Sequence, residues 1–271
     1  MKKLIFRLLY VSGVVRAAAW LNRRRVMVLC YHGVTERTTR NPKDHFGLHV
    51  RHDRFLAHLD FLRRHYRIVS LEDYLTSRPQ AKALPDYSVV LTFDDGYRNF
   101  FTAAAPRLAA QGMTASVFLI TDRVRNDEAR VVNNWVESDD ETYLSWAEAQ
   151  QLSQQGFEFG SHTCSHLKLP ELSMMEIEHE LRDSSAGITR QLKTEAIPLA
   201  YPYGLASHGI ATTAKSLGYV CALTTDTGFI DGETNLFMLN RTLIGDDDDV
   251  AAFATRVSGL TRWLSRGSAL W

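Results

Sequence analysis

This chain of 271 residues has few cysteines, no net charge and no internal repeat, and each absence removes a class of protein. Its three cysteines are widely spaced: Cys30, Cys164 and Cys221. An odd number without a C-x-x-C pair gives no indication of a disulfide framework. Lys plus Arg and Asp plus Glu both total 31, so the overall charge gives no reason to expect nucleic acid as a partner.

The chain also lacks low-complexity tracts and Pro-, Gly- or Ser-rich linkers, so nothing in its composition divides it into separate parts. Apolar residues make up 45% of the sequence, which is enough for a sizeable core. We therefore expect one main domain over residues 26–271, preceded by an N-terminal segment of residues 1–25.

The N-terminal segment has no acidic residue but carries seven Lys or Arg side chains. It is too short and too charged to be expected as a membrane span. Five apolar side chains would share one face of a helix: Leu4, Leu8, Val11, Val15 and Ala18. Three interpretations remain open, namely a helix in peripheral contact with an anionic membrane, a helix packed against the domain, and a cleaved secretory signal. A cytoplasmic or inner-membrane-associated location is favoured over export.

From residue 26 onward, short apolar runs alternate with helical patterns. Strands are expected at residues 26–31, 67–69, 89–93, 115–120, 157–160, 197–201, 220–224 and 237–244. Capping boxes that begin at Ser145 and Ser173 predict two helix starts. This alternation predicts parallel strands joined by helical crossovers. Seven or eight such units favour a (β/α) barrel, and a doubly wound sheet is the alternative.

Polar side chains follow several of these strands at their carboxyl ends, where barrel enzymes build their active sites. They are Asp94, Asp95, His162 and His166, together with His32, Tyr203 and Asp246. A single Asp or His in such a place is weak evidence. Five strands that deliver reactive groups to one face are much stronger evidence for an active site.

One carboxylate and two imidazoles, from Asp95, His162 and His166, form a ligand set for a divalent metal that leaves a coordination position open. Zinc, or another small divalent ion, would polarise a substrate carbonyl and lower the pKa of a bound water. Asp94 lies beside this set and could accept a proton from the attacking water. Asp-Gly alone would indicate only a turn, but the combination predicts metal-assisted hydrolysis.

Two motifs carry a resemblance to a known family: Thr92-Phe93-Asp94-Asp95-Gly96 and His162-Thr163-Cys164-Ser165-His166. They resemble the first two motifs of the polysaccharide deacetylases, also called NodB-homology or carbohydrate esterase family 4 enzymes. Tyr201-Pro202-Tyr203-Gly204 resembles part of the third motif. The segment Leu29-Cys30-Tyr31-His32-Gly33-Val34 is similar to the branch that contains exopolysaccharide N-deacetylases.

The resemblance implies a distorted (β/α) barrel of about seven parallel strands that removes acetyl groups from N-acetylated sugars with the help of a metal. By matched position, Asp94 would be the catalytic base. The metal ligands would be Asp95, His162 and His166, and zinc is the favoured ion. The backbone N–H of Tyr203 would help to hold the tetrahedral oxyanion.

Two positions depart from the family pattern. The third motif often begins with an arginine that orients the base, but Ala200 occupies that position here, and Arg241 could supply the guanidinium instead. The last motif usually carries a histidine that protonates the leaving amine, but residues 243–246 contain none. Asp246 or His32 could serve in its place.

The expected partner is an N-acetylated sugar polymer or oligomer, such as an exopolysaccharide or a glycan precursor. Two alternatives remain open: a metal-dependent O-acetyl esterase or small-amide hydrolase, and a catalytically silent glycan-binding barrel. The intact Asp94 argues against the silent barrel, because a pure binder has no need of a base beside its metal.

Overall fold

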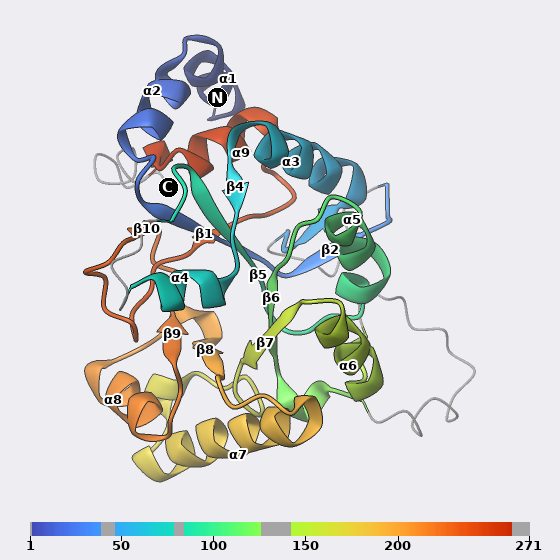
Figure 1. Ribbon diagram of the computed structural model, residues 1–271, viewed down its shortest axis with the longest axis vertical. Helices are drawn as coiled ribbons and strands as arrows, with labels where there is room; N and C mark the ends of the chain where they lie inside the picture. The colour runs from blue at the N-terminus through green and yellow to red at the C-terminus, as the bar shows by residue number, and fades with distance from the viewer. Residues whose placement is uncertain (1, 39–46, 79–83, 126–141, 262–271) are drawn as a thin grey trace.

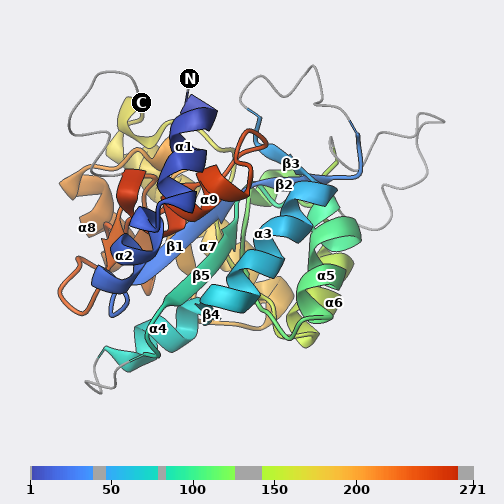
Figure 2. The same cartoon turned by 90° about the horizontal axis from the view of Figure 1, so that it is seen from above.

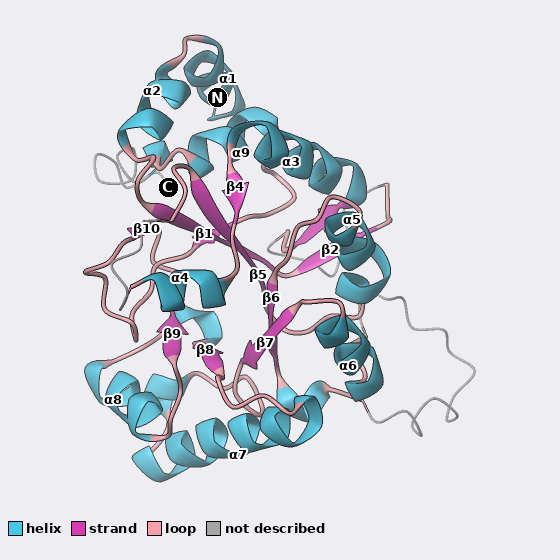
Figure 3. Cartoon of the chain, in the orientation of Figure 1, coloured by secondary structure: helices cyan, strands magenta, loops and turns pink. Residues whose placement is uncertain are grey.

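The computed structural model describes residues 2–38, 47–78, 84–125 and 142–261. Its central element is a sheet that curls on itself, with helices packed around the outside (Figures 1 and 3). Nine strands form this sheet: β1 Val26–Tyr31, β4 Arg67–Ile68, β5 Ser88–Phe93, β6 Ser116–Leu119, β7 Glu158–Ser161, β8 Pro198–Ala200, β9 Cys221–Leu223, β10 Phe229–Ile230 and β11 Thr242–Leu243.

The strand order along the sheet is β10-β1-β5-β6-β7-β8-β9, with β4 paired to β5 and β11 paired to β1. Every pairing in it is parallel except that of β1 with β10. Leu223 at the end of β9 makes a parallel bridge to Leu239, and the chain then continues into β11. The last strands therefore return to the first, which confirms the expected distorted barrel.

Helices cover the outer face of the sheet. The α-helices are α1 Lys2–Val11, α2 Val14–Leu21, α3 His52–His65, α4 Leu71–Ser77, α5 Ala105–Ala109, α6 Trp146–Gln154, α7 Met174–Leu192, α8 His208–Ser216 and α9 Val250–Val257. A π-helix, η1 (Phe100–Ala104), precedes α5, and short 3₁₀ helices occur at η2 (Thr121–Arg123), η4 (Leu169–Glu171) and η5 (Pro202–Gly204). A small parallel pair, β2 (Gly33–Thr35) and β3 (His49–Arg51), lies outside the main sheet.

The buried strands explain why the sheet forms where it does. Every residue of β1 and of β5 is buried, and five residue pairs run in register from Met27–Val89 to Tyr31–Phe93. Such continuous apolar runs are typical of parallel strands that are covered on both faces. Both predicted capping boxes are present, because Ser145 and Ser173 each bond reciprocally with the Glu three residues later.

Four details of the sequence analysis were wrong. The run at residues 237–244 forms a strand only at Thr242–Leu243, and β2, β3 and β10 were not anticipated. The N-terminal segment is two helices, because Gly13 adopts a left-handed conformation (φ 82°) and ends the first helix. Val15 is consequently buried, whereas Leu4, Leu8 and Val11 are exposed, so these side chains do not share one face.

The two N-terminal helices pack against the domain: α1 lies against α9 in both views (Figures 1 and 2). Phe6 is buried there beside Ala251 and Ala252. Within the described residues, no single helix has the length and apolar character needed to cross a membrane. The pair Lys3–Val11 and Val14–Leu21, bent by 73°, meets these criteria only when both helices are counted together.

Candidate active site

The site lies at the carboxyl ends of neighbouring parallel strands. Tyr31 pairs with Phe93, so the next residues, His32 and Asp94, leave β1 and β5 at the same edge. Ser161 ends β7 two strands away, and His162 follows it. The parallel topology therefore brings these side chains together from segments that are far apart in the sequence.

The turn after β5 directs two adjacent carboxylates to different partners. Asp95 and Gly96 both have positive φ, 70° and 72°. The positive φ favours glycine at position 96, where a Cβ would also lie 2.7 Å from Cδ2 of Leu119. The conformation leaves the Asp94 carboxylate facing Arg241 and the Asp95 carboxylate facing His162 and His166.

Asp95, His162 and His166 form the cluster that the sequence predicts as metal ligands. The Oδ1 atom of Asp95 lies 3.5 Å from Nε2 of His162 and 3.5 Å from Nε2 of His166. All three ligand atoms lie within 4.8 Å of one another. Oδ1 of Asp95 is buried and, within the described part of the chain, has no hydrogen-bond partner. A buried carboxylate oxygen without a donor fits a site that is completed by a cation.

The protein orients His162 for this role and keeps His166 neutral. Nδ1 of His162 donates a hydrogen bond to the Ala200 carbonyl (2.7 Å), which leaves Nε2 free to act as a ligand. Ala200 thus orients the His162 imidazole through its backbone carbonyl. Burial, together with the neighbouring His162, lowers the pKa of His166 to about 4, so its imidazole is neutral at pH 7.

Glu180 of α7 fixes the loop between the two histidines and was not anticipated. Its carboxylate accepts hydrogen bonds from the backbone N–H groups of Cys164 (3.0 Å) and Ser165 (2.9 Å) and from the Ser165 hydroxyl (2.6 Å). Glu180 is buried on the same helix face as Ile177 and Leu181. A lone acid on an apolar helix face was the sequence signal that could have revealed it.

Asp94 is held by Arg241, which is fully buried. The guanidinium makes two hydrogen bonds to the carboxylate, Nη1 to Oδ1 (2.6 Å) and Nη2 to Oδ2 (2.8 Å), and Nε donates to the Thr224 carbonyl. Burial alone would raise the pKa of Asp94, but the Arg241 guanidinium and His162 hold it well below its usual range. Asp94 is therefore ionised at any working pH. The thiol of Cys30 also donates to Oδ2 (3.3 Å).

The two residues considered as the proton donor have different surroundings. His32 is half-buried close to Asp94, and its Nδ1 atom is buried without a hydrogen-bond partner among the described residues. Asp246 instead accepts hydrogen bonds from the backbone and side chain of Arg51 (both 3.1 Å) and lies 3.7 Å from Arg54. The Asp246 carboxylate is thus engaged in an ion-pair cluster.

Tyr203 lies at the edge of the metal-ligand cluster, on η5. Its ring packs against the His166 ring with centroids 4.7 Å apart. Its backbone adopts φ 58°, and in the described part of the chain no backbone carbonyl accepts a hydrogen bond from its N–H. Gly204 is required next, because a Cβ there would lie 2.0 Å from Oγ1 of Thr225. The turn therefore presents an available backbone donor beside the cluster.

This fold and site define the class of protein. The polysaccharide deacetylase family model matches residues 81–222, which are more than half of the chain and contain Asp94, Asp95, His162 and His166. The chain belongs to the polysaccharide deacetylase family.

Individual relatives agree with this assignment. The chain is 22% identical over 249 residues to YxkH of Bacillus subtilis, whose name also places it among polysaccharide deacetylases, and the match covers 90% of this chain and 81% of YxkH. It is 25% identical over 208 residues to the poly-β-1,6-N-acetyl-D-glucosamine N-deacetylase of Staphylococcus aureus (73% of this chain, 68% of that enzyme).

A solved structure shares the fold. The deacetylase PplD of Streptococcus pyogenes, solved in complex with acetate, superposes with a TM-score of 0.74 and 24% sequence identity. The superposition covers 86% of this chain and 98% of PplD. This similarity confirms the fold that the sequence led us to expect.

Proposed function

We propose that residues 26–271 form a catalytic domain that hydrolyses the N-acetyl groups of N-acetylhexosamine units in a polysaccharide or glycan precursor. The observation that carries the proposal is the partnerless Asp95 oxygen between two histidine Nε2 atoms, beside an Asp94 that is kept ionised. The N-deacetylase activity in the name of the Staphylococcus aureus relative supports the choice of an acetamide substrate.

Asp95, His162 and His166 would hold a divalent metal, for which zinc suits the nitrogen and oxygen ligands. Bound there, the metal would polarise the acetyl carbonyl and make a water more acidic. The Asp94 carboxylate accepts the proton of the attacking water, and Arg241 holds it in place. The N–H of Tyr203 donates to the oxygen that becomes negative during attack.

Amide hydrolysis also needs a proton for the departing amine. We assign this role to His32 rather than to Asp246, because His32 lies near Asp94 and has an imidazole nitrogen without a partner. The Asp246 carboxylate is instead engaged by Arg51 and Arg54, which tie it into an ion-pair cluster. The products are acetate and the free amino sugar.

The test combines metal content with acetate release. The purified full chain should bind about one divalent metal per molecule and release acetate from N-acetylglucosamine oligomers, lose this activity on chelation, and regain it when zinc is added. His166→Gln should lose both metal and activity. His179→Gln, which changes an exposed histidine on α7, is the matched control and should lose neither.

The other outcomes separate the alternatives. Hydrolysis of acetyl esters but not of acetamides would identify an esterase. Metal binding with glycan binding, but with hydrolysis of neither bond, would identify a silent binding barrel. Absence of metal after zinc is added would remove the basis of the proposal.

A further inference from the structure

The helix pair α1 and α2 presents an unusual concentration of exposed apolar side chains. Eight of the fifteen large apolar side chains that are exposed among the described residues lie between Leu4 and Leu21. Val11 and Leu21 are exposed by 76% and 72%, and Leu4 by 63%. Such a concentration of exposed apolar side chains marks an interaction site.

The fold does not need this surface for its own stability. Phe6 and Val15 point inward and are buried, and Leu9 packs with them against the core. The pair is thus attached to the domain by one set of side chains, while a second set faces outward. Figure 1 shows α1 and α2 at one end of the molecule, with α7 and α8 at the opposite end.

The same helices are strongly basic. Residues 1–25 contain seven Lys or Arg and no Asp or Glu. Arg23 and Arg25 face Asp86 and Asp231 of the domain. Lys3, Arg7, Arg16 and Arg24 form no ion pair with any of the described residues, so these four positive charges are available to an external anion.

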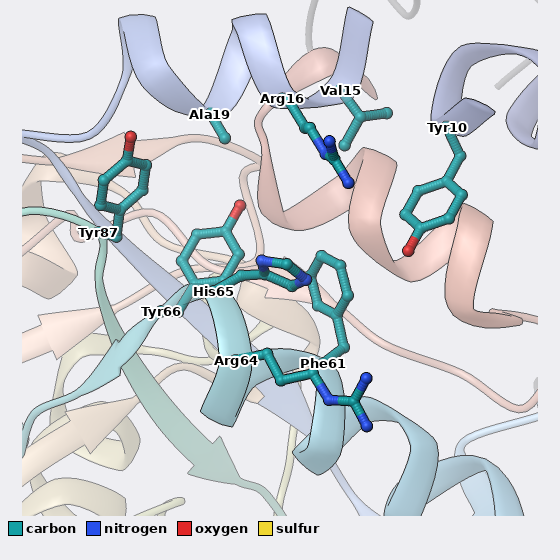
Figure 4. A pocket seen from close by; sticks show the side chains of 9 residues that line it. All are labelled: Tyr10, Val15, Arg16, Ala19, Phe61, Arg64, His65, Tyr66 and Tyr87. Atoms are coloured by element: carbon teal, nitrogen blue, oxygen red, sulfur yellow. The ribbon is translucent and has the colours of Figure 1, made fainter. Parts of the chain in front are cut away.

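A cavity of about 360 Å³ lies where α1 and α2 meet α3, and it extends this basic character (Figure 4). Arg16, Arg64 and His65 line it together with four aromatic rings. Asp60 binds Arg64, but the cavity lining itself contains no acid. Cations beside aromatic rings suit a ligand with an anionic head and an apolar body.

We propose that α1 and α2 dock on the surface of a membrane that contains anionic lipids. The exposed apolar side chains enter the boundary of the acyl chains, and the unpaired cations, with Arg16 at the cavity, bind lipid phosphates. Trp20, which is exposed by 55%, lies at the level of the headgroups, where Trp is enriched. This inference is independent of the proposed activity.

The charges favour a membrane over a second copy of the chain as the occupant of this surface. Apposing two copies through this surface would bring two sets of unpaired cations together without an acid between them, which is repulsive. An anionic bilayer supplies both the apolar interior and the negative charge.

The test is co-sedimentation of the full chain with vesicles of phosphatidylcholine, with and without phosphatidylglycerol. We expect binding only to the anionic vesicles and its loss at high salt. The double change Leu8→Ser and Val11→Ser should weaken binding about tenfold or more. The matched double change Met174→Ser and Met175→Ser, on exposed α7 positions at the opposite end, should leave binding unchanged.

A second set of variants tests the charges. Arg7→Gln, Arg16→Gln and Arg24→Gln should each weaken binding about fivefold. Arg190→Gln, at an exposed position of α7, should leave vesicle binding unchanged.

The position of Trp20 can be tested by fluorescence. Brominated lipids should quench the fluorescence of Trp20, and Trp20→Phe should abolish that quenching. Circular dichroism and acetate release, which should match the unchanged chain, verify that each variant is folded.

Three results would overturn the proposal. Equal binding to both kinds of vesicle, or to neither, would remove the role of anionic lipids. A dimer that dissociates with the Leu8 and Val11 changes would show that a second copy covers this surface. Extraction from cell membranes by detergent alone, and not by high salt or alkaline carbonate, would show that the helices span the membrane rather than lie on it.

Discussion

Asp94, which we propose as the base, and His32, which we propose as the acid, differ in how completely their polar atoms are bonded. Both oxygens of Asp94 accept hydrogen bonds from Arg241, and Nδ1 of the neighbouring His162 donates to a carbonyl. His32 instead has a buried nitrogen for which the described residues offer no partner. A carboxylate that must stay ionised, such as Asp94, is held by buried hydrogen-bond donors. An imidazole that gives up and takes back a proton, as proposed for His32, needs a ring nitrogen that is not already bonded.

The largest loss of kcat is expected when the proposed base, Asp94, is replaced. Asp94→Asn should lower kcat about 10³-fold, because the amide cannot accept a proton from water. Bound metal should be unchanged, since Asp95 and the two histidines remain. Acetate release measures the first quantity and metal analysis the second. Asp183→Asn, at an exposed position on α7, serves as the control, and an active Asp94→Asn enzyme would show that the base lies elsewhere.

A smaller loss of kcat is expected when the proposed acid, His32, is replaced. His32→Ala should lower kcat about 10²-fold, because the amine would then leave without a positioned proton donor. Asp246→Asn should reduce kcat by less than about threefold if it acts only within its ion pairs. Acetate release from acetamide and ester substrates should show a larger loss for the amide with His32→Ala. A larger loss of kcat for Asp246→Asn than for His32→Ala would show that Asp246, and not His32, is the proton donor.

Arg241 is expected to act through Asp94. Arg241→Lys keeps the charge but loses the two-point hydrogen bonding, so the pKa of Asp94 should rise. The acid limb of the kcat/KM profile should therefore move to higher pH, with about a tenfold loss of kcat at neutral pH. If Arg241 had only a structural role, Arg241→Lys would lower stability without moving the acid limb. That result would argue against a role of Arg241 in positioning Asp94.

Glu180 is expected to affect the metal more than the chemistry. Glu180→Gln removes the charge that holds the Cys164 and Ser165 N–H groups, so the His162–His166 loop should be less well fixed. Zinc affinity should fall about tenfold, as measured by competition with a chelator. Glu178→Gln, two residues earlier on the exposed face of α7, should have no such effect.

The contrast between the half-buried His32 and the fully buried His58 gives the mildest prediction, which concerns stability alone. His58 is fully buried. Its Nδ1 accepts from the Tyr31 hydroxyl, and its Nε2 donates to the Asp248 carbonyl. Burial lowers its pKa from 6.5 to about 4.

Because the unfolded chain binds the proton more readily, the free energy of unfolding should fall as the pH drops from 6.5 to 4. The contribution of His58 to this fall should be about 3 kcal/mol. His58→Gln should flatten this slope and leave kcat near neutral pH unchanged. Urea unfolding at several pH values measures the slope, and an unchanged slope in the variant would contradict the pKa shift.

The sequence predicted the strands near the site well. Residues 26–31 form β1 as expected, and β5, β6 and β7 begin and end within one residue of their predictions. Their apolar runs are continuous, and the flanking turns are marked by Gly or Asp. The short strands β2, β3 and β10 have two or three residues each, too few for a periodic pattern to reveal them.

The interactions that orient the site were less predictable. Arg241 was considered only because Ala200 left a role vacant, and Glu180 was missed. Each contacts a residue distant in the chain: Arg241 lies 147 positions from Asp94, and Glu180 lies 16 from Cys164. No local periodicity encodes such pairs, because they depend on how the sheet curls and on which face of α7 packs against β7.

The sequence by itself determined the alternation of strands and helices, their caps, and the order in which reactive side chains follow the strands. These features depend on hydrophobic patterning and hydrogen bonding within a few residues. The tertiary structure decided that Arg241 reaches Asp94, that His58 is buried, and which apolar side chains of the N-terminal segment face outward. Those outcomes depend on how distant segments pack together, which no interaction within a few residues determines.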